Sequence, residues 1–200
     1  MWNDPYIKQL NPLLEGLLPN RSIIIVYQND PSSPATALFT DALSRKVPEW
    51  RDELGNSTTY LGHFPAMDVP GRTIGSTIRN FALLNTIIDT PYAFAFHHNP
   101  DVVTSRTIKG ASIYNEANNL VPCDPTTIYA AMMDHKDDIT SAISLAPGAN
   151  SWPMVLVNSI TIHTREMTDC TKASGLLDYL YWAQTDADAS SMATAYAPIL

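Results

Sequence analysis

Hydroxyl, amide and carboxylate side chains gather in one short turn of this sequence, between residues 28 and 36. The turn reads Gln28-Asn29-Asp30-Pro31-Ser32-Ser33-Pro34-Ala35-Thr36. Such side chains donate or accept hydrogen bonds, and can therefore hold a polar ligand or an anion. The turn is a candidate ligand-binding site whose candidate residues are Gln28, Asn29, Asp30, Ser32, Ser33 and Thr36.

The segments on either side of the turn determine what it could bind. Residues 22–27 are a short apolar run with β-branched members, which predicts a strand covered on both faces. Apolar side chains then recur at helical spacing, at Ala35, Leu38, Phe39, Ala42 and Leu43. A strand that leads into a helix through such a turn directs backbone N–H groups and the positive end of the helix dipole at one place. The simpler interpretation is an ordinary connection, in which Ser32 or Ser33 caps the helix.

The rest of the chain alternates predicted helices and strands. This alternation indicates an α/β fold with a largely parallel sheet. Helices are expected from Pro5 to before Pro12, over 48–54, over 74–88, over 126–133 with Asp124 or Thr126 as the cap, over 137–145, over 170–184 and from Ser190; strands are expected over 92–97, 108–114 and 152–164.

Composition and charge exclude several function classes. The 200 residues are 45% hydrophobic and 16% charged, which is typical of a globular chain. The net charge of -8 disfavours non-specific binding to nucleic acid or to an anionic membrane, and no apolar run is long enough to cross a membrane. The sequence holds no P-loop, no nucleophile elbow and no dinucleotide-binding glycine pattern, and His97-His98 lacks metal-ligand spacing. We therefore expect no catalytic residue, no metal and no cofactor.

Two cysteines and two N-glycosylation triplets bear on the compartment. The triplets begin at Asn20 and Asn56 and fit a secreted chain. In a secreted chain Cys123 and Cys170 are expected to pair, and two buried free thiols are the alternative. We expect an extracellular protein, or a periplasmic one if the source is bacterial. The first residues lack the apolar core of a signal peptide, so a mature or excised piece is expected.

Several separated stretches share their order and their residues with one known family. Together they resemble the periplasmic phosphate-binding protein of bacterial phosphate ABC transporters, a two-lobed solute-binding protein. The stretches are Trp2-Asn3-Asp4-Pro5 (WNDP in the family), Phe39-Thr40-Asp41-Ala42-Leu43 (FTDYL), Val47-Pro48-Glu49-Trp50 (SPEW), Thr90-Pro91 (TPGSIGYV), Asn115-Glu116-Ala117-Asn118 with Val121-Pro122 (N-x-x-G-x-x-V-x-P), and the closing Leu177-Asp178-Tyr179-Leu180-Tyr181-Trp182-Ala183.

The resemblance implies a type II periplasmic-binding-protein-like lobe, with a mostly parallel mixed sheet flanked by helices. It divides the chain into a connecting segment (1–20), a second-lobe-like domain (21–152) and a return strand with C-terminal helices (153–200). The family's first lobe, which supplies many ligand contacts, would precede Met1. The expected partners are therefore a small polar ligand or anion, and the missing lobe or another protein chain.

The ligand turn departs from the family pattern. The family's turn reads roughly R-S-D-G-S-G-T-T, and its arginine grips phosphate with two hydrogen bonds. In this chain Gln28 or Asn29 stands in the arginine position. Losing two charge-assisted bonds costs roughly 1.5–3 kcal/mol for each, so tight phosphate binding should be lost.

Three hypotheses follow. The first is a ligand-binding or sensing module without catalysis. The second is a structural or assembly domain that has lost its ligand. The third is a phosphate binder that uses a substitute cation, Arg72 or Arg106.

Overall fold

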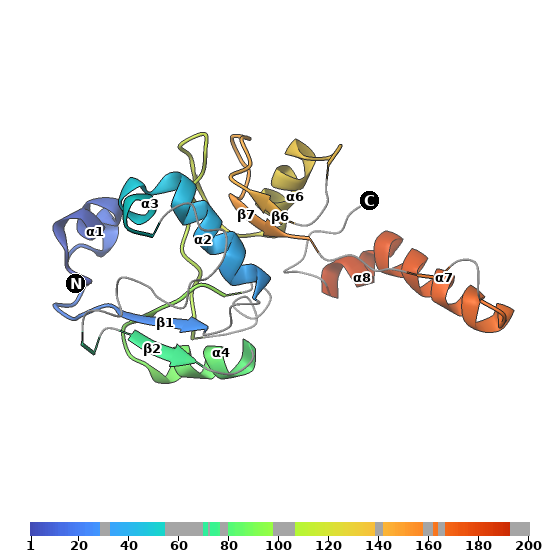
Figure 1. Cartoon of the computed structure of the whole chain (residues 1–200), viewed down its shortest axis with the longest axis horizontal. Helices are drawn as coiled ribbons and strands as arrows, with labels where there is room; N and C mark the ends of the chain where they lie inside the picture. The colour runs from blue at the N-terminus through green and yellow to red at the C-terminus, as the bar shows by residue number, and fades with distance from the viewer. Residues whose placement is uncertain are drawn as a thin grey trace. The chain divides into compact units, whose positions relative to one another are not determined.

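The computed structural model describes residues 1–28, 33–54, 70–71, 73–76, 80–97, 107–138, 142–157, 162–163 and 167–192 (Figure 1). The chain divides into two compact units, one of residues 1–101 with 105–108 and the other of residues 102–104 with 109–200. The boundaries expected after residues 20 and 152 concern lobes of a longer protein and stay a prediction.

Helices and short strands alternate along both units. The first unit contains α1 (Pro5–Leu10), the 3-10 helix η1 (Pro12–Leu14), β1 (Ile24–Gln28), α2 (Pro34–Lys46), α3 (Pro48–Leu54), β2 (Thr73–Ser76), α4 (Asn80–Asp89) and β3 (Ala93–Phe94). The second unit contains β4 (Ile113–Tyr114), β5 (Leu120–Val121), α6 (Pro125–Asp134), β6 (Ala142–Ser144), β7 (Met154–Leu156), α7 (Cys170–Thr185) and α8 (Ala187–Met192).

A parallel three-stranded sheet organises the first unit. Its order is β2-β1-β3, so the apolar strand β1 lies in the centre. Val26 of β1 is fully buried, and α4 packs against the same strand. Because all three strands run in one direction, their carboxyl ends meet at one edge of the sheet. Ligands of open α/β folds bind at this edge, and α2 begins after β1 ends there.

Three helices begin with the same two-residue device. Asp4, Ser33 and Asp124 are N-caps, and a proline follows each of them at the first helical position. A cap side chain accepts a hydrogen bond from a backbone N–H that the helix leaves without a partner, and proline has no N–H to lose there. These starts confirm the predicted helix beginnings at Pro5 and after Ser33 and Asp124.

Two left-handed backbone positions coincide with glycines of the resembling family. Tyr92 has φ 65° where the family pattern TPG has glycine, and Asn118 has φ 61° at the glycine of N-x-x-G. Glycine adopts this conformation without strain, and asparagine tolerates it better than most other residues. The backbone at both positions therefore agrees with the resemblance, although the residue types differ.

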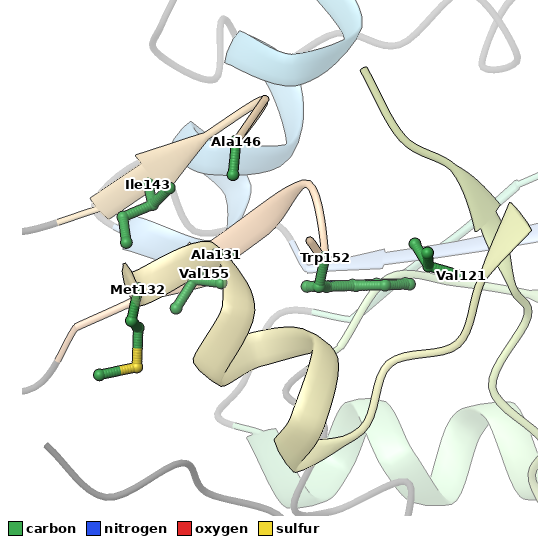
Figure 2. Close-up of a cluster of buried hydrophobic side chains, with 7 residues drawn as sticks. All are labelled: Val121, Ala131, Met132, Ile143, Ala146, Trp152 and Val155. Atoms are coloured by element: carbon green, nitrogen blue, oxygen red, sulfur yellow. The ribbon is translucent and has the colours of Figure 1, made fainter. Parts of the chain in front are cut away.

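The second unit has its own apolar core between α6 and two antiparallel ladders, β4–β5 and β6–β7. Figure 2 shows the buried side chains, with the Trp152 ring extending toward Val121. Ile113, Cys123, Ile128, Met154 and Val157 pack around this cluster as partly buried neighbours. The members of the buried cluster are Val121, Ala131, Met132, Ile143, Ala146, Trp152 and Val155.

Two predicted helices are wrong in part, and the sheet differs from the expected one. Residues 74–76 form part of β2, and residues 142–144 form β6. Pairing with β1 and with β7 gives these segments strand hydrogen bonds that a local helical pattern does not reveal. The described strands form one small parallel sheet and two antiparallel ladders, where the sequence predicted one mostly parallel sheet.

The ends of other helices and strands also differ from the predicted ones. The predicted strands over 92–97, 108–114 and 152–164 shorten to β3, β4 and β7 in the described chain. The last helix, α8, begins at Ala187 instead of Ser190, because Asp186 accepts hydrogen bonds from the N–H groups of Asp188 (2.8 Å) and Ala189 (3.2 Å). No helix of the described ranges is long and apolar enough to span a membrane.

Candidate ligand-binding site

Ser33 and Thr36 are the predicted ligand residues whose side chains the structure describes. Ser33 caps α2, and its Oγ accepts a hydrogen bond from the Thr36 N–H at 3.4 Å. This confirms the simpler prediction that a serine of the turn caps the helix. Both side chains are buried, Ser33 at 6% exposure and Thr36 at 0%. The start of α2 thus places two hydroxyl groups under cover, after the carboxyl end of β1.

Within the part of the chain that the structure describes, the Thr36 hydroxyl is buried without a hydrogen-bond partner. Thr40, one turn further along α2, is also buried, but its Oγ1 donates toward the carbonyl oxygens of Thr36 (3.0 Å) and Ala37 (3.1 Å). Leaving a buried hydroxyl unpaired costs about 1–3 kcal/mol, so native proteins contain few such groups. The Thr36 hydroxyl, in the first turn of α2, therefore has hydrogen-bonding capacity to offer a ligand.

The burial of α2 shows what the sequence pattern missed. Leu38 and Ala42 are buried as predicted, whereas Ala35, Phe39 and Leu43 are only half-buried. A second buried stripe consists of hydroxyl residues at a spacing of four, which are Thr36, Thr40 and Ser44. A pattern based on apolar residues treats threonine and serine as surface positions, so it does not find this stripe. The spacing of four was the signal that could have found it.

An aromatic pair fixes α2 near the end of β3. The rings of Phe39 and Phe96 stack with centroids 4.3 Å apart and planes 17° apart. Phe39 lies one helical turn after Thr36, and Phe96 lies two residues beyond β3. The pair therefore brings the first turns of α2 and the chain that leaves β3 to the same edge of the parallel sheet.

Several predicted residues fall outside the described ranges. Gln28 is the last residue of β1, but its side chain is not among those described, and Asn29, Asp30 and Ser32 lie in the gap that follows. The candidate substitute cations Arg72 and Arg106 and the glycosylation candidate Asn56 also lie outside these ranges. Their roles stay predictions.

The other predicted positions that the structure describes are Asn20, Cys123 and Cys170. Asn20 is exposed in the segment before β1, so its carboxamide is accessible. Cys123 and Cys170 are both free thiols in the structure, the first half-buried and the second exposed, so the predicted pairing has no support here and stays a prediction. Burial, with a smaller contribution from the Asp124 charge, raises the pKa of the Cys123 thiol to about 12. No group of three potential metal ligands occurs among the described residues.

A buried polar clamp in the second unit was not predicted. Asn115 is 1% exposed, and its Nδ2 lies 3.1, 3.0 and 3.2 Å from the carbonyl oxygens of Gly148, Ala149 and Ser151. From α6, Asp134 accepts hydrogen bonds from the Gly148 N–H (2.8 Å) and the Ser151 hydroxyl (2.6 Å). These bonds hold the loop before β7 in place, and sequence spacing alone could not pair groups more than thirty residues apart.

Known proteins with similar sequences fall into two groups. The chain is 26% identical over 92% of its length to the phosphate-binding protein PstS of Methanocaldococcus jannaschii, and 25% identical over 99% to PstS of Pasteurella multocida. It is also 32% identical over 96% of its length to R818 of Acanthamoeba polyphaga mimivirus, which is named as a candidate serine/threonine-protein kinase/receptor. No protein-family model matches the chain.

These relatives are longer than the chain. It spans 49% and 55% of the two PstS proteins, and 12% of the mimivirus protein. The similarity to PstS over nearly the whole chain supports a phosphate-binding-protein-like module of the solute-binding superfamily. The mixed α/β architecture is consistent with that fold.

Proposed function

We propose that this chain is a non-catalytic module that binds or senses a small polar ligand or an anion. One observation carries the proposal. At the start of α2, after the strand that leads to the predicted ligand turn, the Thr36 hydroxyl is buried and has no hydrogen-bond partner among the described residues. The PstS names of several relatives support a ligand of this kind, and an extracellular or periplasmic location is proposed with it.

The proposal includes a partner, because the PstS relatives contain about as much chain again outside the matched part. A second lobe of similar size, on the same polypeptide or on another, would complete the module. Uncovered apolar side chains support this: α7 has no buried residue, and its Leu177 and Tyr181 are 57% and 72% exposed. A 16-residue helix with apolar residues around much of its circumference normally packs against more than one neighbour.

The test is calorimetric titration with phosphate and then sulfate, on the wild type and on Thr36→Val. Valine keeps the shape of threonine but removes the hydroxyl. We expect binding of the anion to weaken by about 10-fold or more, because a hydrogen bond to a charged group is lost. Without ligand, the same variant should be as stable as the wild type or more stable by up to about 1 kcal/mol, since an unpaired buried hydroxyl has gone.

Thr40→Val is the matched control. Thr40 is buried on the same stripe, but its hydroxyl is already paired within α2. Removal of the Thr40 hydroxyl should leave the affinity for the anion unchanged. The proposal fails if Thr36→Val binds phosphate and sulfate as the wild type does.

A structural or assembly domain is the second candidate function. The burial of Ser33 and Thr36 favours it, because a domain that lost its ligand would have the turn covered by protein. The uncovered side chains of α7 favour it as well. This function predicts that a well-folded sample releases no heat with phosphate or sulfate, and that Thr36→Val changes stability alone.

A further inference from the structure

A row of large apolar side chains lies open on the first helices of the first unit. It consists of Tyr6 and Leu10 of α1, Leu13 and Leu14 of η1, and Leu17. We call this row the N-terminal stripe. Its members recur every three or four residues, a spacing that favours one face of a helical segment. Their exposed fractions run from 42% to 94%, and Leu13 is the most exposed. The stripe is therefore an apolar surface open to solvent.

Hydrogen bonds hold the segment that carries the stripe in one arrangement. Three backbone hydrogen bonds of 2.8–3.0 Å close the successive turns between Lys8 and Leu17. At the base of the segment, the Trp2 N–H donates to the Arg21 carbonyl oxygen at 2.9 Å. The Trp2 indole N–H donates to the Tyr92 carbonyl oxygen at 3.1 Å, which ties the segment to the chain just before β3. The segment is preformed, so a partner that covers the stripe need not order its backbone.

The charges around the stripe narrow the kind of partner. The stripe itself carries no charge, and the charged side chains within residues 1–20 are Asp4, Lys8 and Glu15. A helix that lies on a membrane surface usually has several lysines or arginines on its polar face, which this segment lacks. The net charge of -8 also disfavours an anionic membrane. The stripe therefore fits an uncharged apolar surface of a protein.

The area of the stripe is enough for a pair of copies. One tyrosine and four leucines at these exposures offer roughly 500 Å² of apolar surface, in the range where patches mark interaction sites. Two stripes packed together would bury about 1,000 Å² in total, which is the lower limit for a specific interface. In a two-fold interface the same patch meets itself, and an uncharged stripe brings no like charges together.

We propose that a second copy of this chain docks on the N-terminal stripe, so that two stripes pack face to face in a symmetric dimer. An interface of this size forms and dissociates readily, and the dimer is populated at micromolar concentrations or above. The inference is independent of the proposed ligand site, because neither Ser33 nor Thr36 belongs to the stripe.

The test is sedimentation velocity on the 200-residue chain, from roughly 1 to 100 µM. The wild type should change from monomer to dimer as its concentration rises. Leu13→Glu places a charge on the most exposed member of the stripe and should weaken the dimer at least about tenfold, because that charge would be desolvated. Leu177→Glu is the matched control. It places the same charge on an exposed leucine of α7, in the other unit, and should dimerise like the wild type.

Salt gives a second signature. Each copy carries a net charge of -8, so the two copies repel each other at low ionic strength, whereas the apolar contact is not screened. Added sodium chloride should therefore strengthen the dimer. A dimer that salt dissociates would be held by ion pairs, which would overturn the inference.

Three further results would overturn it. The first is a wild type that stays monomeric over the whole concentration range. The second is a dimer that Leu177→Glu disrupts and Leu13→Glu does not. The third is a monomeric wild type that floats with phosphatidylcholine vesicles and loses this property in Leu13→Glu, which would assign the stripe to a membrane. Leu17→Glu, at a position 77% exposed, repeats the test if Leu13→Glu does not fold.

Discussion

Asn115 offers a direct test of the buried clamp in the second unit. Asn115→Asp keeps the size and shape of the side chain but replaces the Nδ2 donor by a carboxylate oxygen. That oxygen would face the carbonyl oxygens of Gly148, Ala149 and Ser151, which lie 3.0–3.2 Å from the present nitrogen. The bond that Asn115 Oδ1 accepts from the Asn119 N–H at 2.9 Å can survive. The substitution therefore removes the donor side of the clamp and, at neutral pH, places a negative charge beside these carbonyl oxygens.

The size of the destabilisation follows from the number of hydrogen atoms that Asn115 Nδ2 can donate. An amide nitrogen carries two, so two of its three carbonyl contacts count as strong bonds, each worth about 1 kcal/mol. The Ser151 carbonyl is buried and would lose this donor, which adds about 1–3 kcal/mol. The expected loss in the free energy of unfolding is about 3–5 kcal/mol at neutral pH. It should shrink at acid pH, because a protonated Asp regains one donor.

Urea denaturation followed by tryptophan fluorescence measures this loss, since Trp152 is buried in the same unit. Asn119→Asp is the matched control: Asn119 is exposed, and its Nδ2 donates to one carbonyl, that of Ala149, at 2.9 Å. The control should cost no more than about 0.5 kcal/mol. A loss for Asn115→Asp that equals that of the control would refute the reasoning.

Three other predictions concern the second unit. Because burial raises the pKa of Cys123 from 9.0 to about 12, its thiolate fraction near neutral pH is roughly a thousandfold lower than that of an ordinary thiol, so a thiol reagent should modify Cys170 first. Below pH 9 the folded and the unfolded protein both hold the proton of the Cys123 thiol. Above pH 9 the unfolded protein loses that proton first. The unfolding free energy should therefore fall as the pH rises from 9 to 12, and less so in Cys123→Ala; equal slopes would contradict this. Gly148→Ala should lower the melting temperature, because its Cβ would lie 2.6 Å from an Asp134 carboxylate oxygen; Gly175→Ala, with open space in α7, should raise it, and equal shifts would contradict the prediction.

The sequence by itself predicted the elements that depend on neighbouring residues. Asp4-Pro5, Ser33-Pro34 and Asp124-Pro125 begin helices because a cap and a proline act within one turn of chain. The apolar run before the ligand turn became the central strand β1. The order of the resembling stretches agrees with the similarity to phosphate-binding proteins over nearly the whole chain.

Elements that depend on distant partners were not predictable in the same way. Residues 74–76 and 142–144 have helical apolar spacing, yet they pair as strands because β1 and β7 lie beside them. The amide of Asn115 finds its carbonyl partners more than thirty residues further along the chain. No local pattern specifies such a pairing.

For the candidate site, the sequence determined that Ser33 and Thr36 flank the first turn of a helix that follows an apolar strand. Tertiary structure alone decided that Thr36 is buried with no partner in the described ranges while Thr40 is paired, and that Phe39 stacks on Phe96, which brings the chain that leaves β3 to the same edge. The physical reason is that capping and periodicity act over a few residues. Burial and strand register arise only when separate segments pack together.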